Sequence, residues 1–260
     1  MTHSSVCIET VFPELSIPER IARCKQSGFS AVEFWHWHNK DMDAIRAAAL
    51  RENVRVSAFC IDSADPKIAT RIAQRALNDP DGDGLQCAVQ ESIAQAIRIG
   101  THQLIVTVGD AIPQIPETQQ RQTVIHNLRR IQPYLEEAGI TLLVEPIDRQ
   151  ERPGYLIPTV EGMISVLTQV GSENIRMLYD IFHQSVQGDF SVDGLVRALP
   201  YIGHIHVADF PGRGEPGSGT LPYAAIFDTL RTHGYDRSIG FEFFPVVPMQ
   251  PFRFLEQYCL

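Results

Sequence analysis

The chain lacks the segments that would place it in a membrane or carry it across one. No apolar run approaches the roughly 20 residues that a membrane-spanning helix needs. Its first residues do not combine a basic stretch with a long apolar one, which is the pattern of a secretion signal. We therefore expect no membrane partner and a cytoplasmic location.

Paired cysteines and an excess of basic residues are also missing. The 5 cysteines are scattered, and no two have the C-x-x-C spacing of a metal site, so we expect reduced thiols. Lys and Arg number 22 against 31 Asp and Glu, which gives a net charge of −9. This balance disfavours nucleic acid as a partner. A small anionic substrate remains compatible with it, because one arginine or a metal ion can override the global charge.

Two nucleotide-binding motifs are absent. The chain has no G-x-x-x-x-G-K-[ST] segment, and the first expected strand leads into Glu-Thr-Val-Phe-Pro13 rather than a glycine fingerprint, which argues against an open doubly wound sheet. Instead, short β-type runs alternate eight times with helical stretches, without a linker or a shift in composition. We predict an α/β fold, a (β/α)8 TIM barrel that forms one domain over residues 1–260.

The expected strands set the boundaries of this barrel. The first covers residues 6–10 and the last covers residues 239–243. A short additional helix is expected over residues 66–78, in the loop that follows the third strand.

Four polar side chains each close an expected strand in the second half of the chain: Glu145, Asp180, His206 and Glu242. Active sites of such barrels lie at the carboxyl ends of the strands, so we expect these side chains to converge. A buried carboxylate costs several kcal/mol unless it is paired or binds a metal. Three carboxylates and one imidazole suit a divalent cation such as Mn²⁺, Mg²⁺ or Co²⁺. We predict one shared metal site.

Two loops supply candidate substrate-binding residues. His183 follows Asp180 by three residues, and we expect it on the loop that leaves the sixth strand. The glycine-rich loop 209–219 follows the seventh strand and carries Arg213 and Glu215. Arginine suits a bidentate grip on a carboxylate, and the glycines let the backbone approach a ligand. A mobile surface loop is the alternative reading of this segment.

Histidines and aromatic residues elsewhere allow more than one interpretation. Trp35, in Trp35-His-Trp-His38, is expected to wall a small polar substrate, or else to belong to a packing cluster. A metal site on the two histidines there would lack nearby carboxylates. His204 precedes His206 by two residues and faces the same side of its strand, so we expect a deeper, hydrogen-bonded core histidine. Asp209 is expected to help orient a ligand.

Two opposed glutamates beside a metal ion favour proton transfer next to a carbonyl group. One glutamate removes the proton from the carbon that bears a hydroxyl, and the metal stabilises the resulting enediolate. Return of a proton to the neighbouring carbon is aldose–ketose isomerisation, whereas return to the opposite face is epimerisation. No redox cofactor is needed, and nothing indicates a nucleophilic Ser or Cys.

Several segments resemble the xylose isomerase-like barrel superfamily, and within it the hydroxypyruvate isomerases. They are Ala31-Val-Glu-Phe, Leu143-Val-Glu-Pro146, Tyr179-Asp-Ile-Phe-His183, Gly203-His-Ile-His-Val-Ala-Asp209, Pro211-Gly-Arg-Gly-Glu-Pro-Gly-Ser-Gly219 and Gly240-Phe-Glu-Phe. The resemblance implies Glu145 and Glu242 as the acid/base pair, the four strand-end residues as metal ligands, and His183 and Arg213 toward the substrate. It names the conversion of hydroxypyruvate to tartronate semialdehyde as the candidate reaction.

Departures from that family leave other functions open. Hydroxypyruvate isomerases commonly have glutamine where this chain has His206, whereas sugar epimerases of the superfamily have histidine, so a ketose 3-epimerase of the tagatose/psicose type is the main alternative. A keto-inositol dehydratase, an endonuclease of the endonuclease IV type and a non-catalytic sugar-binding barrel are further alternatives. The endonuclease would need more metal-binding histidines and a basic surface. The partner is expected to be a small molecule, and the sequence leaves open whether the chain forms a homo-oligomer.

Overall fold

Eight parallel strands close into a barrel in the computed structural model, which describes residues 4–246 and 252–258. The strands are β1 (Ser4–Cys7), β2 (Ala31–Phe34), β3 (Arg55–Cys60), β4 (Gln103–Thr107), β5 (Thr141–Glu145), β6 (Ile175–Asp180), β7 (Ile202–Val207) and β8 (Ile239–Phe241). Each strand pairs with the next, and β1 pairs with β8, with Ser4 opposite Ile239. The predicted (β/α)8 barrel is confirmed.

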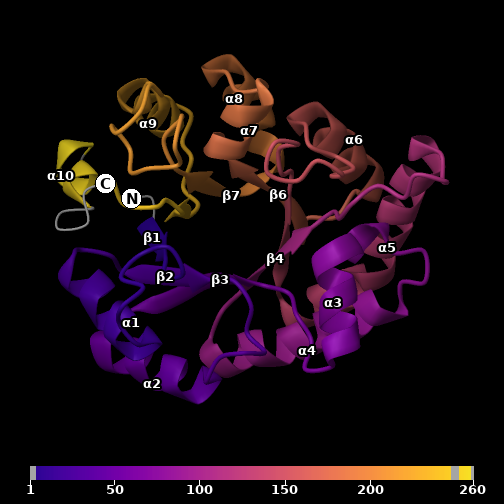
Figure 1. The fold of residues 1–260 in the computed structure, drawn as a ribbon, viewed down its shortest axis with the longest axis horizontal. Coiled ribbons are helices and arrows are strands. Elements are labelled where there is room, and N and C mark those ends of the chain that lie inside the picture. The colour runs from indigo at the N-terminus through magenta and orange to yellow at the C-terminus, as the bar shows by residue number, and fades with distance from the viewer. Residues whose placement is uncertain (1–3, 247–251, 259–260) are drawn as a thin grey trace.

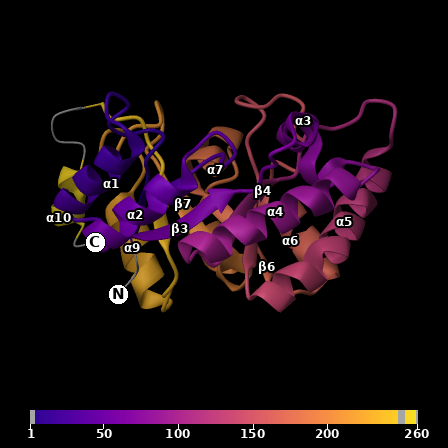
Figure 2. The ribbon, with the colours of Figure 1, turned by 90° about the horizontal axis from the view of Figure 1, so that it is seen from below.

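Helices surround this barrel, as Figure 1 shows. They are α1 (Ile17–Gln26), α2 (Met42–Glu52), α3 (Pro66–Arg75), α4 (Asp83–Ile99), α5 (Glu117–Ala138), α6 (Val160–Val170), α7 (Ile181–Gln187), α8 (Val192–Ala198), α9 (Tyr223–Thr232) and α10 (Arg253–Gln257). Helix α4 illustrates how the sequence sets an element: its buried residues recur at helical spacing, and Gly100 ends it in the left-handed conformation with φ +75°. In the side view of Figure 2, α3 lies above the barrel among the loops that follow the strands.

The structure corrects three local expectations. Strand β1 ends at Cys7 rather than at residue 10, because the backbone N–H and the hydroxyl of Thr10 both donate to the carbonyl of Cys7 and turn the chain. Strand β8 ends at Phe241 rather than at residue 243. His183 lies on helix α7 and not on a loop; the helix begins directly after Asp180, whose side chain caps it. The extra helix over residues 66–78 is present as α3 and a 3₁₀ turn, Ala76–Asn78.

The barrel interior is apolar on one side and polar on the other. Ala58, Ile105, Leu143 and Leu178, from β3 to β6, form a small hydrophobic cluster separate from the main core. Glu33 of β2 is paired with Ala58, and His204 of β7 is paired with Leu178. Because side chains alternate along a strand, these two polar residues face the same interior. The barrel therefore buries a carboxylate and an imidazole in its centre.

Two bulk expectations can be compared with this fold. Cys7, Cys24, Cys60 and Cys87 are unpaired, whereas Cys259 lies outside the described residues. Within the described part of the chain, no helix is both long enough and apolar enough to cross a membrane.

Candidate active site

The four predicted metal ligands come together at the carboxyl ends of β5 to β8. Glu145, Asp180, His206 and Glu242 are all buried, and each offers a ligand atom within 4.8 Å of the others. Strands β5 and β6 end at Glu145 and Asp180, whereas Glu242 follows the last residue of β8. Within the group, His206 Nδ1 lies 3.7 Å from Glu242 Oε2.

This donor set fits a divalent cation. Three carboxylates and one imidazole give oxygen and nitrogen donors with more negative than positive charge. Among the described residues, neither ring nitrogen of His206 has an aligned hydrogen-bond partner, although both are buried. Because buried polar atoms are rarely left without a partner, the group can accommodate one further species.

Glu145 has the properties of an acid/base group. Burial raises its pKa, and the carboxylates of Glu242 and Asp180 add to this, while His183 and His206 oppose it. The balance sets the pKa of Glu145 to about 7. A carboxyl group with that pKa can both take and return a proton near neutral pH.

The pKa of the neighbouring Asp180 shifts downward, whereas that of His206 shifts upward. Although burial raises the pKa of Asp180, His183 and Arg213 lower it more strongly, so Asp180 is ionised. Burial lowers the pKa of His206, but the charges of Glu33 and Glu242 raise it to about 10. Without a cation, His206 is therefore an imidazolium that partly balances the carboxylates around it.

A buried carboxylate on the loop after β5 orients His183. Asp148 Oδ2 lies 2.7 Å from His183 Nδ1, and the backbone N–H groups of Gln150 and Glu151 donate to Asp148 Oδ1. The other ring nitrogen, Nε2, lies 3.8 Å from Glu145 Oε1. Burial lowers the pKa of His183, but Asp180 and Asp148 raise it to about 9. The structure thus brings His183 to the predicted site.

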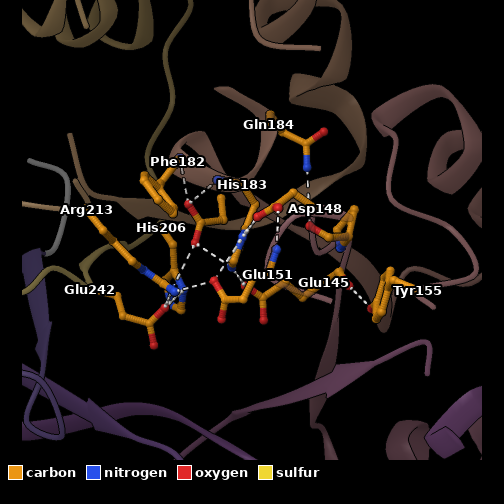
Figure 3. A network of polar contacts seen from close by, with 12 residues as sticks. Glu145, Asp148, Glu151, Tyr155, Phe182, His183, Gln184, His206, Arg213 and Glu242 are labelled. Carbon is orange, nitrogen blue, oxygen red and sulfur yellow. Dashed lines mark hydrogen bonds and ion pairs between the residues drawn. The ribbon is translucent and has the colours of Figure 1, made fainter. Parts of the chain in front are cut away.

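Arg213 reaches the same site from the loop after β7. Its Nη2 donates to Glu242 Oε2 at 2.6 Å and its Nη1 to Glu151 Oε2 at 2.8 Å, so the guanidinium lies between two carboxylates (Figure 3). The loop is held by Asp209, which accepts hydrogen bonds from three backbone N–H groups of this segment. Gly219 permits this packing, because a Cβ there would lie 2.3 Å from the carbonyl oxygen of Phe210. Asp209 therefore orders the loop, and none of the hydrogen bonds described for it involves the four ligands.

A cavity of about 380 Å³ opens above the ligand group. Its lining comprises Trp35, Glu145, Ile147, Glu151, Phe182, His183, Arg213, Glu242 and Phe244. Trp35 reaches this cavity as expected, and its indole N–H donates to Glu242 Oε1 at 2.6 Å. Glu215 does not line the cavity; its carboxylate accepts the backbone N–H of Val246 at 2.8 Å. The predicted residues therefore converge except for Glu215.

The sequence predicts that His36 and His38, which follow Trp35, lack a nearby carboxylate. This prediction is wrong. Asp62, just beyond β3, places Oδ2 3.4 Å from His36 Nδ1 and in close contact with His38 Nδ1. Although burial raises the pKa of Asp62, its hydrogen bonds with these histidines lower it to about 2. A contact between strand ends that lie 24 residues apart could not be read from local spacing.

Sequence reasoning missed three acidic residues at or below the site: Glu33, Asp148 and Glu151. Glu33 interrupts the apolar β2 run Ala31–Phe34, in which all four residues are buried. A charged residue in such a run is itself a signal, because its burial needs a partner. Asp148 and Glu151 stand in a polar loop, where acidic residues are common, so the sequence contained no comparable signal.

Comparison with known proteins agrees with the barrel fold. Residues 21–255 match the family described as xylose isomerase-like TIM barrel. Hydroxypyruvate isomerase of Escherichia coli K12 is 25% identical over 256 residues, covering 94% of each protein. The 2-oxo-tetronate isomerase of Cupriavidus necator is 28% identical over 239 residues, covering 92% of this chain and 91% of that protein. A Brucella melitensis protein, titled AP endonuclease, family 2, has the same fold with a TM-score of 0.90, 24% identity and 99% coverage of each chain.

Proposed function

Because the chain belongs to the xylose isomerase-like TIM barrel family, we propose that it is a divalent-metal-dependent isomerase of a small α-hydroxycarbonyl acid or sugar. Relatives that align with nearly its whole length are named isomerases of hydroxypyruvate and of 2-oxo-tetronate, which supports an enzyme that moves a carbonyl group along a short carbon chain. The observation that carries the proposal is that Glu145 and Glu242 both line one cavity and lie within 4.8 Å of Asp180 and His206.

The two glutamates divide the proton transfers. Glu145 removes the proton from the carbon that bears the hydroxyl group. Glu242 acts on the other side of the cavity, where Trp35 and Arg213 hold its two oxygens in fixed directions. A bound divalent cation would polarise the carbonyl group and stabilise the negative charge of the enediolate.

Two cationic side chains are proposed to bind the polar end of the substrate. His183 is held through Nδ1 by Asp148, which leaves Nε2 toward the cavity. Arg213 already contacts carboxylates, so its guanidinium is in place for a substrate carboxylate that displaces Glu151 or Glu242. This arrangement favours an acid as the substrate, and we propose hydroxypyruvate, which would be converted to tartronate semialdehyde.

A ketose 3-epimerase is the second candidate, and His206 is the observation that favours it. The four-residue set with histidine is the one that resembles sugar epimerases rather than hydroxypyruvate isomerases. The cavity of about 380 Å³ is also within the usual range of small-molecule sites and is not restricted to a three-carbon acid. The two candidates share the enediolate and differ in where the proton returns.

Proton NMR in D₂O tests the proposal. The protein is freed of metal with a chelator, reloaded with Mg²⁺, and mixed in turn with hydroxypyruvate, 2-oxo-tetronate and free ketoses. We expect metal-dependent deuterium incorporation beside the carbonyl, lost in Glu145→Gln and Glu242→Gln and kept in the matched control Glu215→Gln, whose carboxylate lies outside the cavity lining. The product distinguishes isomerisation from epimerisation, and no exchange with any of these compounds would refute the proposal.

A further inference from the structure

A second polar layer lies inside the barrel beneath the proposed metal ligands. Residues two apart on a strand face the same side, so His204 lies one layer below His206, and Gly240 lies one layer below Glu242. Glu33 of β2 extends into this layer from across the barrel. Glu33 is 2% exposed and His204 is 0% exposed, so water does not solvate their contact.

The carboxylate of Glu33 joins the two histidines. Its Oε2 lies 3.0 Å from His204 Nε2, and its Oε1 lies 3.4 Å from His206 Nε2. The other nitrogen of His206, Nδ1, faces Glu242 at 3.7 Å. The imidazole of His206 thus connects the two layers, with one nitrogen toward the proposed metal ligands and the other toward Glu33.

The contacts of Glu33 with His204 and His206 are ion pairs without the alignment of hydrogen bonds. Glu33 Oε1 and the ring nitrogens of both histidines have no aligned partner in the described chain. The carboxylate of Glu33 turns one oxygen toward each histidine, so it can accept an N–H group from both.

The space for this carboxylate exists because residue 240 has no side chain. A Cβ on Gly240 would lie 2.0 Å from Glu33 Oε1 and 2.6 Å from His204 Nε2. Its backbone is not in the left-handed region, so lack of space rather than backbone conformation excludes a larger residue. Gly240→Ala would therefore displace Glu33 without removing any polar group.

We propose that Glu33 is a positioning residue for His206: it accepts the Nε2–H group, fixes the plane of the ring, and directs Nδ1 toward the cation. His204 in turn holds the second oxygen of Glu33. Glu33 does not line the cavity and acts only through His206. A carboxylate on the outer nitrogen of a metal-binding imidazole fixes its tautomer and raises its basicity. This inference rests on the proposed metal site.

Isothermal titration with Mn²⁺ tests the inference in the whole protein. Removing such an outer carboxylate weakens metal binding about 10- to 100-fold. We expect affinity to fall from wild type to Glu33→Gln, which keeps one acceptor, and further in Glu33→Leu. Gly240→Ala should also weaken binding. The matched control is Asp62→Asn, which alters another buried carboxylate between two histidines and should leave Mn²⁺ affinity unchanged.

The outcomes separate this inference from the proposed function. If wild type binds Mn²⁺ and Glu33→Leu binds it equally well, the inference is overturned and the metal site stands. If wild type binds no Mn²⁺, the proposed metal site fails and the inference falls with it. Should Glu33→Leu not fold, wild-type affinity in both Glu33→Gln and Gly240→Ala overturns the inference.

A spectroscopic measurement distinguishes positioning from simple stabilisation. Long-range ¹H–¹⁵N spectra of the Mg²⁺-loaded protein report which nitrogen of His206 carries the proton. We expect Nε2–H in wild type, and loss of the single tautomer in Glu33→Leu or, if it does not fold, in Gly240→Ala. The melting temperature of each metal-free variant is recorded alongside. An unchanged His206 signal in the variant used would contradict the positioning role.

Discussion

Metal binding should release protons in a pH-dependent way, because two of the proposed ligands, Glu145 and His206, bind protons in the metal-free protein. The pKa of Glu145 is raised to about 7 and that of His206 to about 10. A cation binds only the deprotonated forms, so each group opposes metal binding below its own pKa. The sign is therefore fixed: affinity for Mn²⁺ rises as pH rises.

The size of the effect follows from the two pKa values. Between pH 6 and pH 8 the ionised fraction of Glu145 rises about tenfold and that of neutral His206 about a hundredfold, so the affinity should rise about a thousandfold, or about 4 kcal/mol. Metal binding should release about two protons at pH 6 and about one at pH 8. Isothermal titration in buffers of different ionisation enthalpy counts them directly.

A matched variant identifies the proton that depends on pH in this range. Glu145→Gln cannot ionise, so its proton release should be about one at both pH values, even though its affinity is lower. Proton release by wild type that does not change between pH 6 and pH 8 would refute the assignment of the near-neutral pKa to Glu145.

Three further predictions follow from single contacts. Arg213→Met removes the guanidinium between Glu151 and Glu242, so kcat/KM for hydroxypyruvate should fall about 10- to 100-fold, with a smaller loss for neutral ketoses; equal losses in steady-state assays would argue against binding of a substrate carboxylate. Asp148→Asn removes the carboxylate whose hydrogen bond raises the pKa of His183, so an NMR titration should show that pKa falling from about 9, together with a higher KM; an unchanged titration would contradict the contact. Tyr155→Phe removes the hydroxyl that accepts the N–H of Val108, so thermal or urea unfolding should show a loss of about 1–3 kcal/mol, and no loss would mean that this N–H finds another partner.

The barrel could be predicted because its signals are local and repeated. Apolar runs such as 140–144 and 175–179 end in one charged residue, and glycines such as Gly100 and Gly139 end the helices between them. The errors lie where a single side chain decides the local structure. Helix α7 begins at Ile181 because Asp180 caps it from the end of the strand, and this role was not evident for a residue already assigned to a metal.

The site was predictable to the extent that it follows from barrel topology. Strand ends of a closed parallel barrel share one rim, so Glu145, Asp180, His206 and Glu242 had to be near one another. Contacts across the rim or through the barrel depend on side-chain reach and register. The pairing of His183 with Asp148 spans 35 residues, and that of Glu33 with His204 crosses the barrel, so neither has a local spacing.

A preference for an acid over a neutral sugar would follow from the charge balance of the whole site more than from Arg213 alone. In the metal-free protein Arg213 contacts Glu242 at 2.6 Å and Glu151 at 2.8 Å, so its charge is already compensated. A cation that takes Glu242 as a ligand would free one edge of the guanidinium for a substrate carboxylate. Recognition of an acid would then depend on the metal. Binding of a neutral sugar through its hydroxyl groups would not require an ion pair of Arg213 to be broken. Because such coupling is reciprocal, an acid that binds through Arg213 should also tighten the metal, and a ketose should do so less.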